Sequence, residues 1–242
     1  MISGECGTRF GRVREEFERN FAERGDVGAS VCVTVDGETV VDLWGGVANV
    51  ETGAAWERDT VALVWSCTKG AMSLCAHMLV SRGLLDLDAP VARYWPEFAQ
   101  SGEGRGKQDC TVRMLLNHQA GLAAVRQPLP PGGFYDWELV TNALASQEPF
   151  WEPGTRHGYH ALTFGHLIGE VLRRITGTTP GAFFSKEVAE PLGIEFWIGL
   201  PEEIEPRVAP NSPHDAPTAE TAMPRAVITA MTDPTSLQAL VY

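Results

Sequence analysis

The hydrophobic pattern of this chain changes at Ser66. Before this point, two alternating runs, residues 29–35 and 38–43, lie on either side of Asp36-Gly37. Asp-Gly between such runs is a strong signal for a tight β-hairpin. A strand-like run, residues 60–65, then leads into a helical pattern. The sequence therefore predicts a mixed α/β fold in which an antiparallel sheet comes first and helices follow.

Helical periodicity dominates the chain after the hairpin. Helices are expected at residues 66–81, 112–117, 136–145 and 162–175. The first of these ends near Gly83, a residue type suited to the C′ position of a helix. Upstream of the hairpin, four apolar residues at helical spacing predict an amphipathic first helix: Phe10, Val13, Phe17 and Phe21.

The same patterns suggest a division of the chain. Residues 1–65 are expected to hold the first helix and first strands of a sheet domain, and residues 66–208 a helical domain. Residues 209–242 are rich in Pro, Ala and Thr and lack periodicity, so they are interpreted as a linker or long loop.

Ser66 and Lys69 carry the first chemical signal. Residues i and i+3 share one face of a helix, so the Ser66 hydroxyl and the Lys69 amine can come within hydrogen-bond reach. A serine becomes a good nucleophile when an adjacent base takes its proton, and a lysine can be that base where burial or positive charge lowers its pKa. The alternative is a capped surface helix.

Tyr159 stands where such a pair needs a partner. It follows a turn-rich segment, residues 151–158, and precedes the helix expected at 162–175. A phenol near Lys69 would be biased toward phenolate and could relay a proton to or from Ser66. The alternative is that Tyr159 only packs.

Four further motifs accompany Ser66-Cys-Thr-Lys69 and Tyr159 in the sequence. They are Asp42-Leu-Trp-Gly-Gly46, Arg82-Gly-Leu-Leu-Asp-Leu-Asp-Ala-Pro90, Thr111-Val-Arg-Met-Leu-Leu-Asn-His-Gln-Ala-Gly-Leu122 and Pro191-Leu-Gly193. Together they resemble the serine hydrolase superfamily of class C β-lactamases, penicillin-binding proteins and, closest, family VIII carboxylesterases. The resemblance extends from about residue 10 to residue 210. It implies a β-lactamase/transpeptidase-like fold, an antiparallel sheet flanked by helices plus a helical domain.

The resemblance implies a role for each motif residue. Ser66 is the nucleophile and its backbone N–H one oxyanion donor, Lys69 is the activating and orienting partner, and Tyr159 is the general base that later protonates the leaving group. The β-lactamase pattern has Asn two residues after this Tyr, whereas this chain has Ala161, which has no hydrogen-bonding side chain. That change favours simple esters over β-lactams. Candidate substrate contacts are Ala161, its neighbour His160, and Tyr135 in residues 126–135, a loop that is a candidate cleft wall. The alternative for this loop, and the favoured one, is a surface connector.

Relatives of this kind continue beyond position 242, through further strands and a third motif that supplies the second oxyanion donor. Trp197-Ile-Gly199 has the letters of that motif but comes too early. The C-terminal sheet strands are therefore expected to lie outside this chain, and a complementary C-terminal segment or a homo-oligomer is a candidate partner. Loss of one oxyanion donor lowers turnover by about 10²–10³-fold.

Composition restricts the partners. The net charge of −12 argues against nucleic acid, because phosphate neutralisation needs clustered Lys and Arg. No apolar run approaches the ~20 residues of a membrane span, and residues 1–21 lack the apolar stretch of an export signal. A cytoplasmic location is expected.

Cysteine and histidine placement argues against cofactor chemistry. The chain has five cysteines without a CxxC pair, which fits reduced thiols, and Cys67 has no base at a recognisable spacing to make it a catalytic thiol. His157, His160 and His166 form no known metal motif, and His118 belongs to a segment that looks structural in the superfamily. No metal or cofactor is expected.

The sequence thus predicts a serine carboxylesterase that cleaves small esters through an acyl-enzyme on Ser66, or an acyltransferase if an alcohol or amine replaces water. The alternatives are a β-lactamase or DD-peptidase and, from another class, a catalytically silent scaffold or binding protein.

Overall fold

The computed structural model describes residues 2–99 and 106–211. They divide into two compact units, which are described separately. The sheet unit consists of residues 2–64 and 200–211, and the helical unit of residues 65–99 and 106–199. The division at 64/65 lies next to the boundary expected from the sequence. Among the described residues the helical unit reaches Gly199, and the segment after it belongs to the sheet unit, where Val208 and Ala209 pair with Val61 and Ala62.

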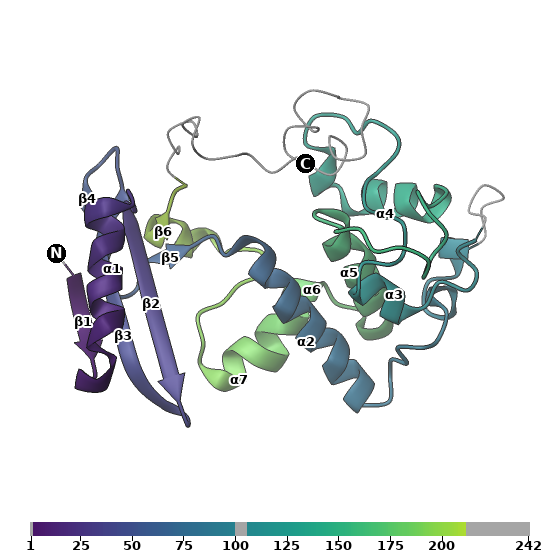
Figure 1. Ribbon diagram of the computed structural model, residues 1–242. Helices are drawn as coiled ribbons and strands as arrows, with labels where there is room; N and C mark the ends of the chain where they lie inside the picture. Colours follow the sequence, from purple (N-terminus) through teal and green to yellow (C-terminus); the bar gives the residue numbers. More distant parts are fainter. Residues whose placement is uncertain (1, 100–105, 212–242) are drawn as a thin grey trace. The chain divides into compact units, whose positions relative to one another are not determined.

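The sheet unit is built around an antiparallel sheet with strand order β1-β3-β2. Strand β4 pairs with the end of β3, and β5 and β6 form a separate parallel pair. Figure 1 shows helix α1 running alongside the sheet. The elements are β1 (Ile2–Cys6), α1 (Gly11–Glu23), β2 (Gly28–Val35), β3 (Glu38–Asn49), β4 (Ala54–Ala55), β5 (Val61–Ala62) and β6 (Val208–Ala209).

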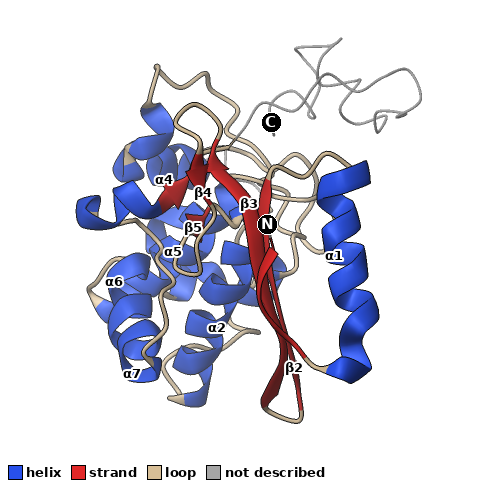
Figure 2. Ribbon diagram, turned by 90° about the vertical axis from the view of Figure 1, so that its left-hand side faces the viewer, coloured by secondary structure: helices blue, strands red, loops and turns tan. Residues whose placement is uncertain are grey.

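The predicted hairpin is confirmed. Strands β2 and β3 pair antiparallel on either side of Asp36-Gly37, and Figure 2 shows the strands in red joined at one end by a tan turn. Asp36 and Gly37 both have positive φ, 52° and 84°, the conformation that suits the right-handed twist of the flanking strands. A register shift between Val33 and Thr34 marks a β-bulge close to the turn.

The predicted amphipathic helix is also confirmed, as α1. Phe17 of α1 and Val41 and Leu43 of β3 are buried together, and Phe10, Val13 and Phe21 pack against them. The apolar face of the helix therefore covers one face of the sheet, as the spacing of its phenylalanines indicates.

Two strands differ from the sequence prediction. Residues 2–6, which precede the predicted first helix and for which no strand was expected, form β1, which pairs with one edge of β3. Gly4 permits this pairing, because its φ is 98° and a Cβ atom there would lie 2.0 Å from the Asp42 carbonyl oxygen. The strand expected over residues 60–65 is reduced to β5, since only Val61 and Ala62 find a partner, in β6.

The helical unit contains the four helices expected from the sequence and two more. They are α2 (Thr68–Ser81), α3 (Val112–Leu116), α4 (Trp137–Ser146), α5 (Thr163–Thr176), α6 (Pro180–Phe184) and α7 (Glu190–Leu192). Side-chain caps fix three N-termini: Thr111, Asp136 and Thr179 accept hydrogen bonds from the N3 amides of α3, α4 and α6.

One continuous apolar core joins these helices. Leu79 of α2, Leu115 of α3, Leu144 of α4 and Leu167 of α5 are all buried in it. All five cysteines are free thiols, and burial raises the pKa of Cys75 to about 11 and of Cys110 to about 12. The core makes α2 and α5 a rigid base for the residues at their N-terminal ends.

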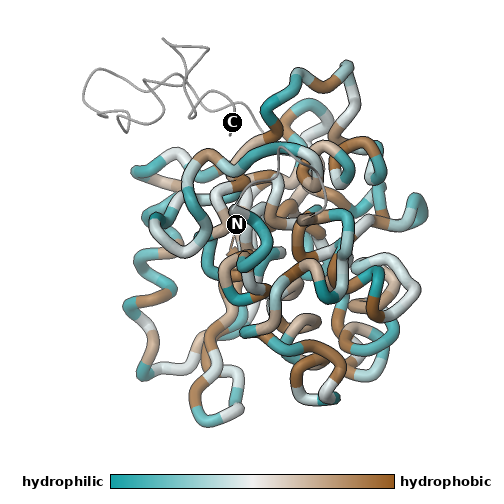
Figure 3. Tube along the Cα trace, turned by 90° about the vertical axis from the view of Figure 1, so that its right-hand side faces the viewer, coloured by the Kyte–Doolittle hydropathy of each residue, from teal (hydrophilic) through white to brown (hydrophobic). Residues whose placement is uncertain are grey.

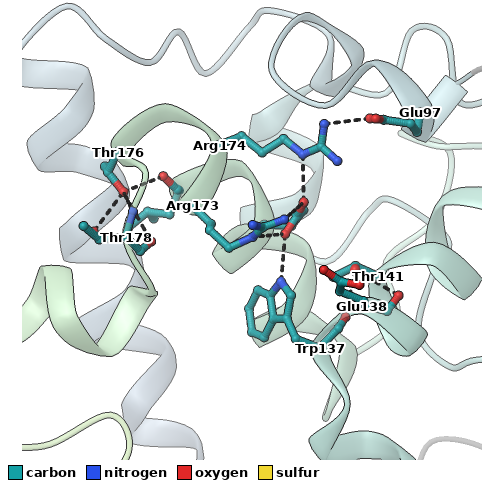
Figure 4. Close-up of polar contacts among 10 residues, drawn as sticks. Glu97, Trp137, Glu138, Thr141, Arg173, Arg174, Thr176 and Thr178 are labelled. Atoms are coloured by element: carbon teal, nitrogen blue, oxygen red, sulfur yellow. Dashed lines mark hydrogen bonds and ion pairs between the residues drawn. The ribbon is translucent and has the colours of Figure 1, made fainter.

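A buried carboxylate ties α5 to α4 and to the segment before α3. Glu170 accepts hydrogen bonds from Trp137 Nε1 at 2.8 Å, from Arg173 through two nitrogens, and from Arg174. Arg174 also pairs with Glu97 at 2.7 Å. Figure 4 shows the indole and both guanidinium groups converging on the single carboxylate. Burial works to raise the pKa of Glu170, but these donors outweigh it and hold the pKa below its usual 4.5.

We expect Glu170→Gln to lower the free energy of unfolding at pH 7 by about 1–3 kcal/mol, because charged hydrogen bonds are lost in a buried site. Since the folded-state pKa is lowered, the stability that Glu170 contributes is present above pH 4.5 and is lost as pH falls through the folded-state pKa. Urea denaturation at pH 7 and at lower pH should therefore show the two proteins converging on acidification. Glu97→Gln, at a side chain 55% exposed, is the control and should change stability by less than about 1 kcal/mol.

Among the described residues, no helix is both long and apolar enough to cross a membrane. Figure 3 agrees with this, because hydrophobic and hydrophilic stretches alternate along the trace.

Candidate active site

Ser66 lies at a sharp turn into α2. Trp65, Ser66 and Cys67 form a 3₁₀ turn, and α2 begins at Thr68. Trp65 has a φ of 46°, a left-handed conformation that is unusual for a bulky residue and costs about 1–3 kcal/mol. The turn leaves Ser66 exposed at the N-terminal end of α2. It therefore presents the hydroxyl where the helix dipole favours negative charge.

The structure brings Ser66, Lys69 and Tyr159 together. Tyr159 Oη donates a hydrogen bond to Ser66 Oγ at 2.6 Å, and Lys69 Nζ donates to the same oxygen at 3.1 Å. Tyr159 lies far from Ser66 in the sequence, so this contact depends on the packing of the segment before α5 against the start of α2. The serine oxygen is thus in direct contact with a phenol and an amine.

Lys69 is held by groups other than Ser66. Its Nζ also donates to the carbonyl oxygen of Ala161 at 2.8 Å. The nitrogen lies 4.8 Å from the centre of the Tyr159 ring and 5.7 Å from that of Phe164, distances typical of cation–π contacts. These contacts fix the amine between α2 and the Tyr159 segment.

The environment of Tyr159 favours its phenolate form. Burial works to raise the pKa of Tyr159, but the hydrogen bond with Ser66 and the nearby Lys69 amine outweigh it and hold the pKa below its usual 10.0. The residue is 40% exposed. A tyrosine in this state can both accept and return a proton near Ser66 Oγ.

His118 holds the segment that carries Tyr159. The backbone N–H of His160 donates to His118 Nδ1 at 3.1 Å, and the N–H of Gly158 donates to the His118 carbonyl oxygen. The His118 ring also lies 4.9 Å from the Tyr159 ring. Tyr159 is therefore held on both sides by bonds to one residue of the loop after α3.

His118 and His160 are held in defined states. His118 has a φ of 63°, and its pKa is lowered by burial, by His157 and by Lys69. His160 is fully buried and accepts from the Leu122 N–H through Nε2 at 3.0 Å, while Nδ1 lies 2.6 Å from the Gly158 carbonyl oxygen. Burial lowers the pKa of His160 to about 4, so its ring is neutral at pH 7.

These contacts correct one sequence prediction. His160 was a candidate substrate contact, but its ring is buried and both ring nitrogens are used within the protein. Tyr135 is 94% exposed, and nothing described connects it with Ser66, Lys69 or Tyr159, so its role stays a prediction. Ala161 is close to the site through its carbonyl oxygen, which binds Lys69.

The sequence interpretation missed His118 and Thr163 as supports of the site. Thr163 Oγ1 donates to the Leu122 carbonyl oxygen at 2.7 Å, beside the bond from the Leu122 N–H to His160. The only signal in the sequence was the assignment of His118 to a structural segment. In the described part of the chain, no three His, Cys, Asp or Glu residues are grouped so that they could hold a metal ion.

The matching family model confirms the resemblance seen in the sequence. Residues 17–239 match the beta-lactamase family. The chain belongs to this family, and it has the β-lactamase/transpeptidase-like fold expected from its motifs.

Individual relatives carry both esterase and β-lactamase names. Esterase/beta-lactamase LipL from Mycobacterium tuberculosis (strain ATCC 25618 / H37Rv) is 36% identical over 227 residues, which are 93% of this chain and 49% of LipL. The chain thus spans about half the length of this curated relative.

Solved structures agree with this assignment. A family VIII carboxylesterase is 44% identical with a TM-score of 0.80, over 86% of this chain and 57% of that one. A penicillin-binding protein homologue from Caulobacter crescentus is 40% identical with a TM-score of 0.83, over 90% of this chain and 58% of that one.

Proposed function

We propose that this chain carries the nucleophile, its activating lysine and the general base of a serine carboxylesterase. The observation that carries the proposal is the contact of Ser66 Oγ with both Tyr159 Oη, at 2.6 Å, and Lys69 Nζ, at 3.1 Å. A nucleophile in hydrogen-bond contact with a base that a third group orients is the arrangement used in covalent acyl transfer. Support also comes from LipL and from the solved carboxylesterase.

The proposed reaction has two steps. Ser66 Oγ attacks the ester carbonyl carbon while its proton passes to the Tyr159 phenolate, and the alcohol then leaves with that proton. In the second step Tyr159 takes a proton from water, the hydroxide attacks the acyl-enzyme, and the proton returns to Ser66 Oγ. Lys69 stabilises the phenolate in each step through its charge and keeps Ser66 Oγ in place.

The oxyanion formed in each step needs donors. We propose the backbone N–H of Ser66 as one of them, because it lies at the N-terminal end of α2, where the helix dipole adds to the stabilisation. The second donor, a complementary C-terminal segment and a cytoplasmic location stay predictions from the sequence.

Ala161 is the residue that favours esters over β-lactams. Its side chain is a methyl group, so no side-chain amide is present to bind the amide of a β-lactam or peptide. Its carbonyl oxygen already accepts a hydrogen bond from Lys69 Nζ. The substrate we propose is a small carboxylic ester, with β-lactam or peptide hydrolysis as the alternative. The name of LipL keeps the β-lactamase alternative open.

A chromogenic panel tests the proposal. We expect the purified protein to hydrolyse short-chain p-nitrophenyl esters with a kcat/KM at least about tenfold above that for nitrocefin, because Ala161 offers no side-chain amide to bind the amide group of a β-lactam. A tenfold ratio corresponds to about 1.4 kcal/mol of transition-state stabilisation. Ala161→Asn is the informative variant and should raise the nitrocefin rate relative to the ester rate. Preferential nitrocefin turnover would establish the β-lactamase alternative, and turnover of neither substrate would support a silent scaffold.

A further inference from the structure

The ring of His118 lies next to the candidate catalytic groups. Its centre is 4.9 Å from the centre of the Tyr159 ring and 5.2 Å from that of Phe164. It also lies close enough to Lys69 for the charge of the amine to lower the pKa of the imidazole. The proposed reaction has no step at this ring, so any effect of His118 on the reaction passes through the groups that it holds.

Nδ1 of His118 holds the peptide group that follows Tyr159. It accepts the backbone N–H of His160 at 3.1 Å, and this N–H belongs to the peptide that joins Tyr159 to His160. On the other side of Tyr159, the His118 carbonyl oxygen accepts the N–H of Gly158 at 3.1 Å. A backbone fixed on both sides of a residue limits where its side chain can point, because χ1 is restricted to staggered values. These two bonds therefore set the position of Tyr159 Oη, 2.6 Å from Ser66 Oγ.

The two bonds from His118 differ in how they depend on protonation. The carbonyl oxygen accepts at any pH, whereas Nδ1 accepts only while it carries no proton. In a protonated imidazole both ring nitrogens are donors. Nδ1–H would then face the N–H of His160, and the hydrogen bond would be replaced by contact between two donors. The Tyr159 segment would lose one of these two attachments and keep the other.

We propose that His118 is a positioning residue of the enzyme, and that its unprotonated Nδ1 keeps Tyr159 Oη on Ser66 Oγ. The inference rests on the proposed function and adds a second protonation requirement to it. The site is active when Tyr159 is a phenolate and His118 is neutral. The backbone of His118 agrees with this role, because its φ of 63° is a conformation that the bonds and contacts of the residue must offset.

The surroundings of His118 favour its neutral form. The ring faces titratable side chains from two segments: Lys69 of α2, and His157, Tyr159 and His160 before α5. Burial, and then repulsion from His157 and Lys69, lowers the pKa of His118 below its usual 6.5. The ring is therefore neutral at pH 7 and takes up its proton only on acidification. The contribution of Nδ1 is present above the pKa of His118 and is lost as pH falls through it.

Two substitutions separate the acceptor from the ring. Asparagine and glycine both tolerate positive φ, so neither strains the backbone at this position. His118→Asn loses the ring but keeps an acceptor, because Oδ1 of asparagine is bonded to Cγ as Nδ1 of histidine is, and the amide does not titrate. His118→Gly loses the ring and the acceptor and keeps the carbonyl oxygen. The comparison of the two variants therefore reports on the bond to the His160 N–H.

The first experiment compares kcat/KM for p-nitrophenyl acetate at pH 8, where His118 of the wild type is neutral. We expect His118→Gly to lower kcat/KM by about 10²-fold, the loss typical of a misplaced catalytic group, and His118→Asn to stay within about fivefold of the wild type. Melting temperatures of the three proteins show whether any loss comes from unfolding. A glycine variant as active as the wild type, or an asparagine variant as impaired as the glycine variant, would overturn the inference.

The second experiment follows kcat/KM of the wild type and His118→Asn from pH 8 down to about pH 4.5. Below the pKa of Tyr159, loss of the phenolate alone gives a fall of about tenfold per pH unit. In the wild type we expect the fall to steepen toward about a hundredfold per unit below the pKa of His118, because two required protonation states are then lost together. His118→Asn should keep the shallower dependence throughout.

Two controls accompany the pH profiles. His157→Asn removes an exposed imidazole whose ring lies 5.9 Å from that of His118. It should keep the steep region and move it to higher pH, because the repulsion that lowers the pKa of His118 is reduced. Acid unfolding, by contrast, would steepen the profiles of all the proteins, His118→Asn included.

Proton NMR provides a readout that needs no turnover. The Cε1–H signal of His118, identified by its absence from His118→Asn, gives the pH at which the ring is protonated. The steep region of the wild-type profile should begin at that pH. A profile with a single slope across the protonation of His118 would overturn the inference and leave the esterase proposal intact. Absence of both ester turnover and fluorophosphonate labelling in the wild type would instead remove the proposed function itself.

Discussion

Ser66→Ala is expected to abolish covalent labelling by a fluorophosphonate and to lower ester kcat/KM by at least ~10³-fold, since removal of a nucleophile leaves only binding and oxyanion stabilisation. The serine oxygen is the shared acceptor of the bonds from Tyr159 and Lys69, so its removal leaves both groups without the atom on which they act. Intact mass spectrometry should show one adduct per wild-type chain and none in the variant.

Two controls separate Ser66 from its neighbours. Cys67→Ala removes an exposed thiol beside the nucleophile, and Ser81→Ala removes a hydroxyl at the other end of α2. Both proteins should be labelled at the wild-type rate within about threefold, because neither substitution removes a hydrogen bond among Ser66, Lys69 and Tyr159. An adduct that persists in Ser66→Ala, or that disappears in Cys67→Ala, would assign the reactive atom to another residue and contradict the mechanism.

The elements that could be predicted from the sequence are those whose conformation is determined by residues within the element itself. The hairpin follows from Asp36-Gly37 between alternating runs, and α1, α2 and α5 follow from apolar spacing that local chain geometry enforces. Strand β1 could not be predicted because it carries Gly4 and Glu5 and owes its conformation to the edge of β3. Likewise β5 is short because its partner, β6, comes from a distant part of the chain.

The same distinction applies to the site. Ser66 and Lys69 are three residues apart, so helical spacing alone predicts their contact. For Tyr159 the loop-to-helix junction left two interpretations open, proton relay and packing, because its distance from Ser66 depends on how two segments pack. The resemblance to a superfamily favoured the first. The misassignment of His160 has the same origin: nothing in the sequence reveals that its ring is buried and that its nitrogens bond to Leu122 and Gly158.

Two residues with strained backbone conformations, Trp65 and His118, adjoin the candidate catalytic residues. Among the described residues other than glycine, positive φ occurs at Asp36 in the hairpin turn and at Trp65 and His118 in the helical unit. Trp65 directly precedes Ser66, and His118 holds the segment of Tyr159. The surrounding core and hydrogen bonds must therefore offset about 1–3 kcal/mol at each position. This cost is consistent with selection for the geometry of Ser66 and Tyr159 rather than for stability.

Tyr159→Phe is expected to lower kcat/KM for esters by about 10²–10⁴-fold, the usual contribution of a positioned general base. The phenylalanine keeps the ring contacts with His118 and Lys69 and removes only the oxygen bonded to Ser66. A loss of this size with little change in the melting temperature would assign the effect to proton transfer.

The pH profile identifies the base. In the wild type, kcat/KM should rise with pH as the phenolate fraction increases, with a midpoint below the usual 10.0 because the pKa of Tyr159 is lowered by Ser66 and Lys69 against the effect of burial. Tyr159→Phe should lose this ascending limb. Tyr94→Phe, which removes a phenol that accepts from the Asp86 N–H, should retain the wild-type profile. If the limb survives in Tyr159→Phe, another group accepts the proton of Ser66, and Lys69, the other group bonded to Ser66 Oγ, becomes the base.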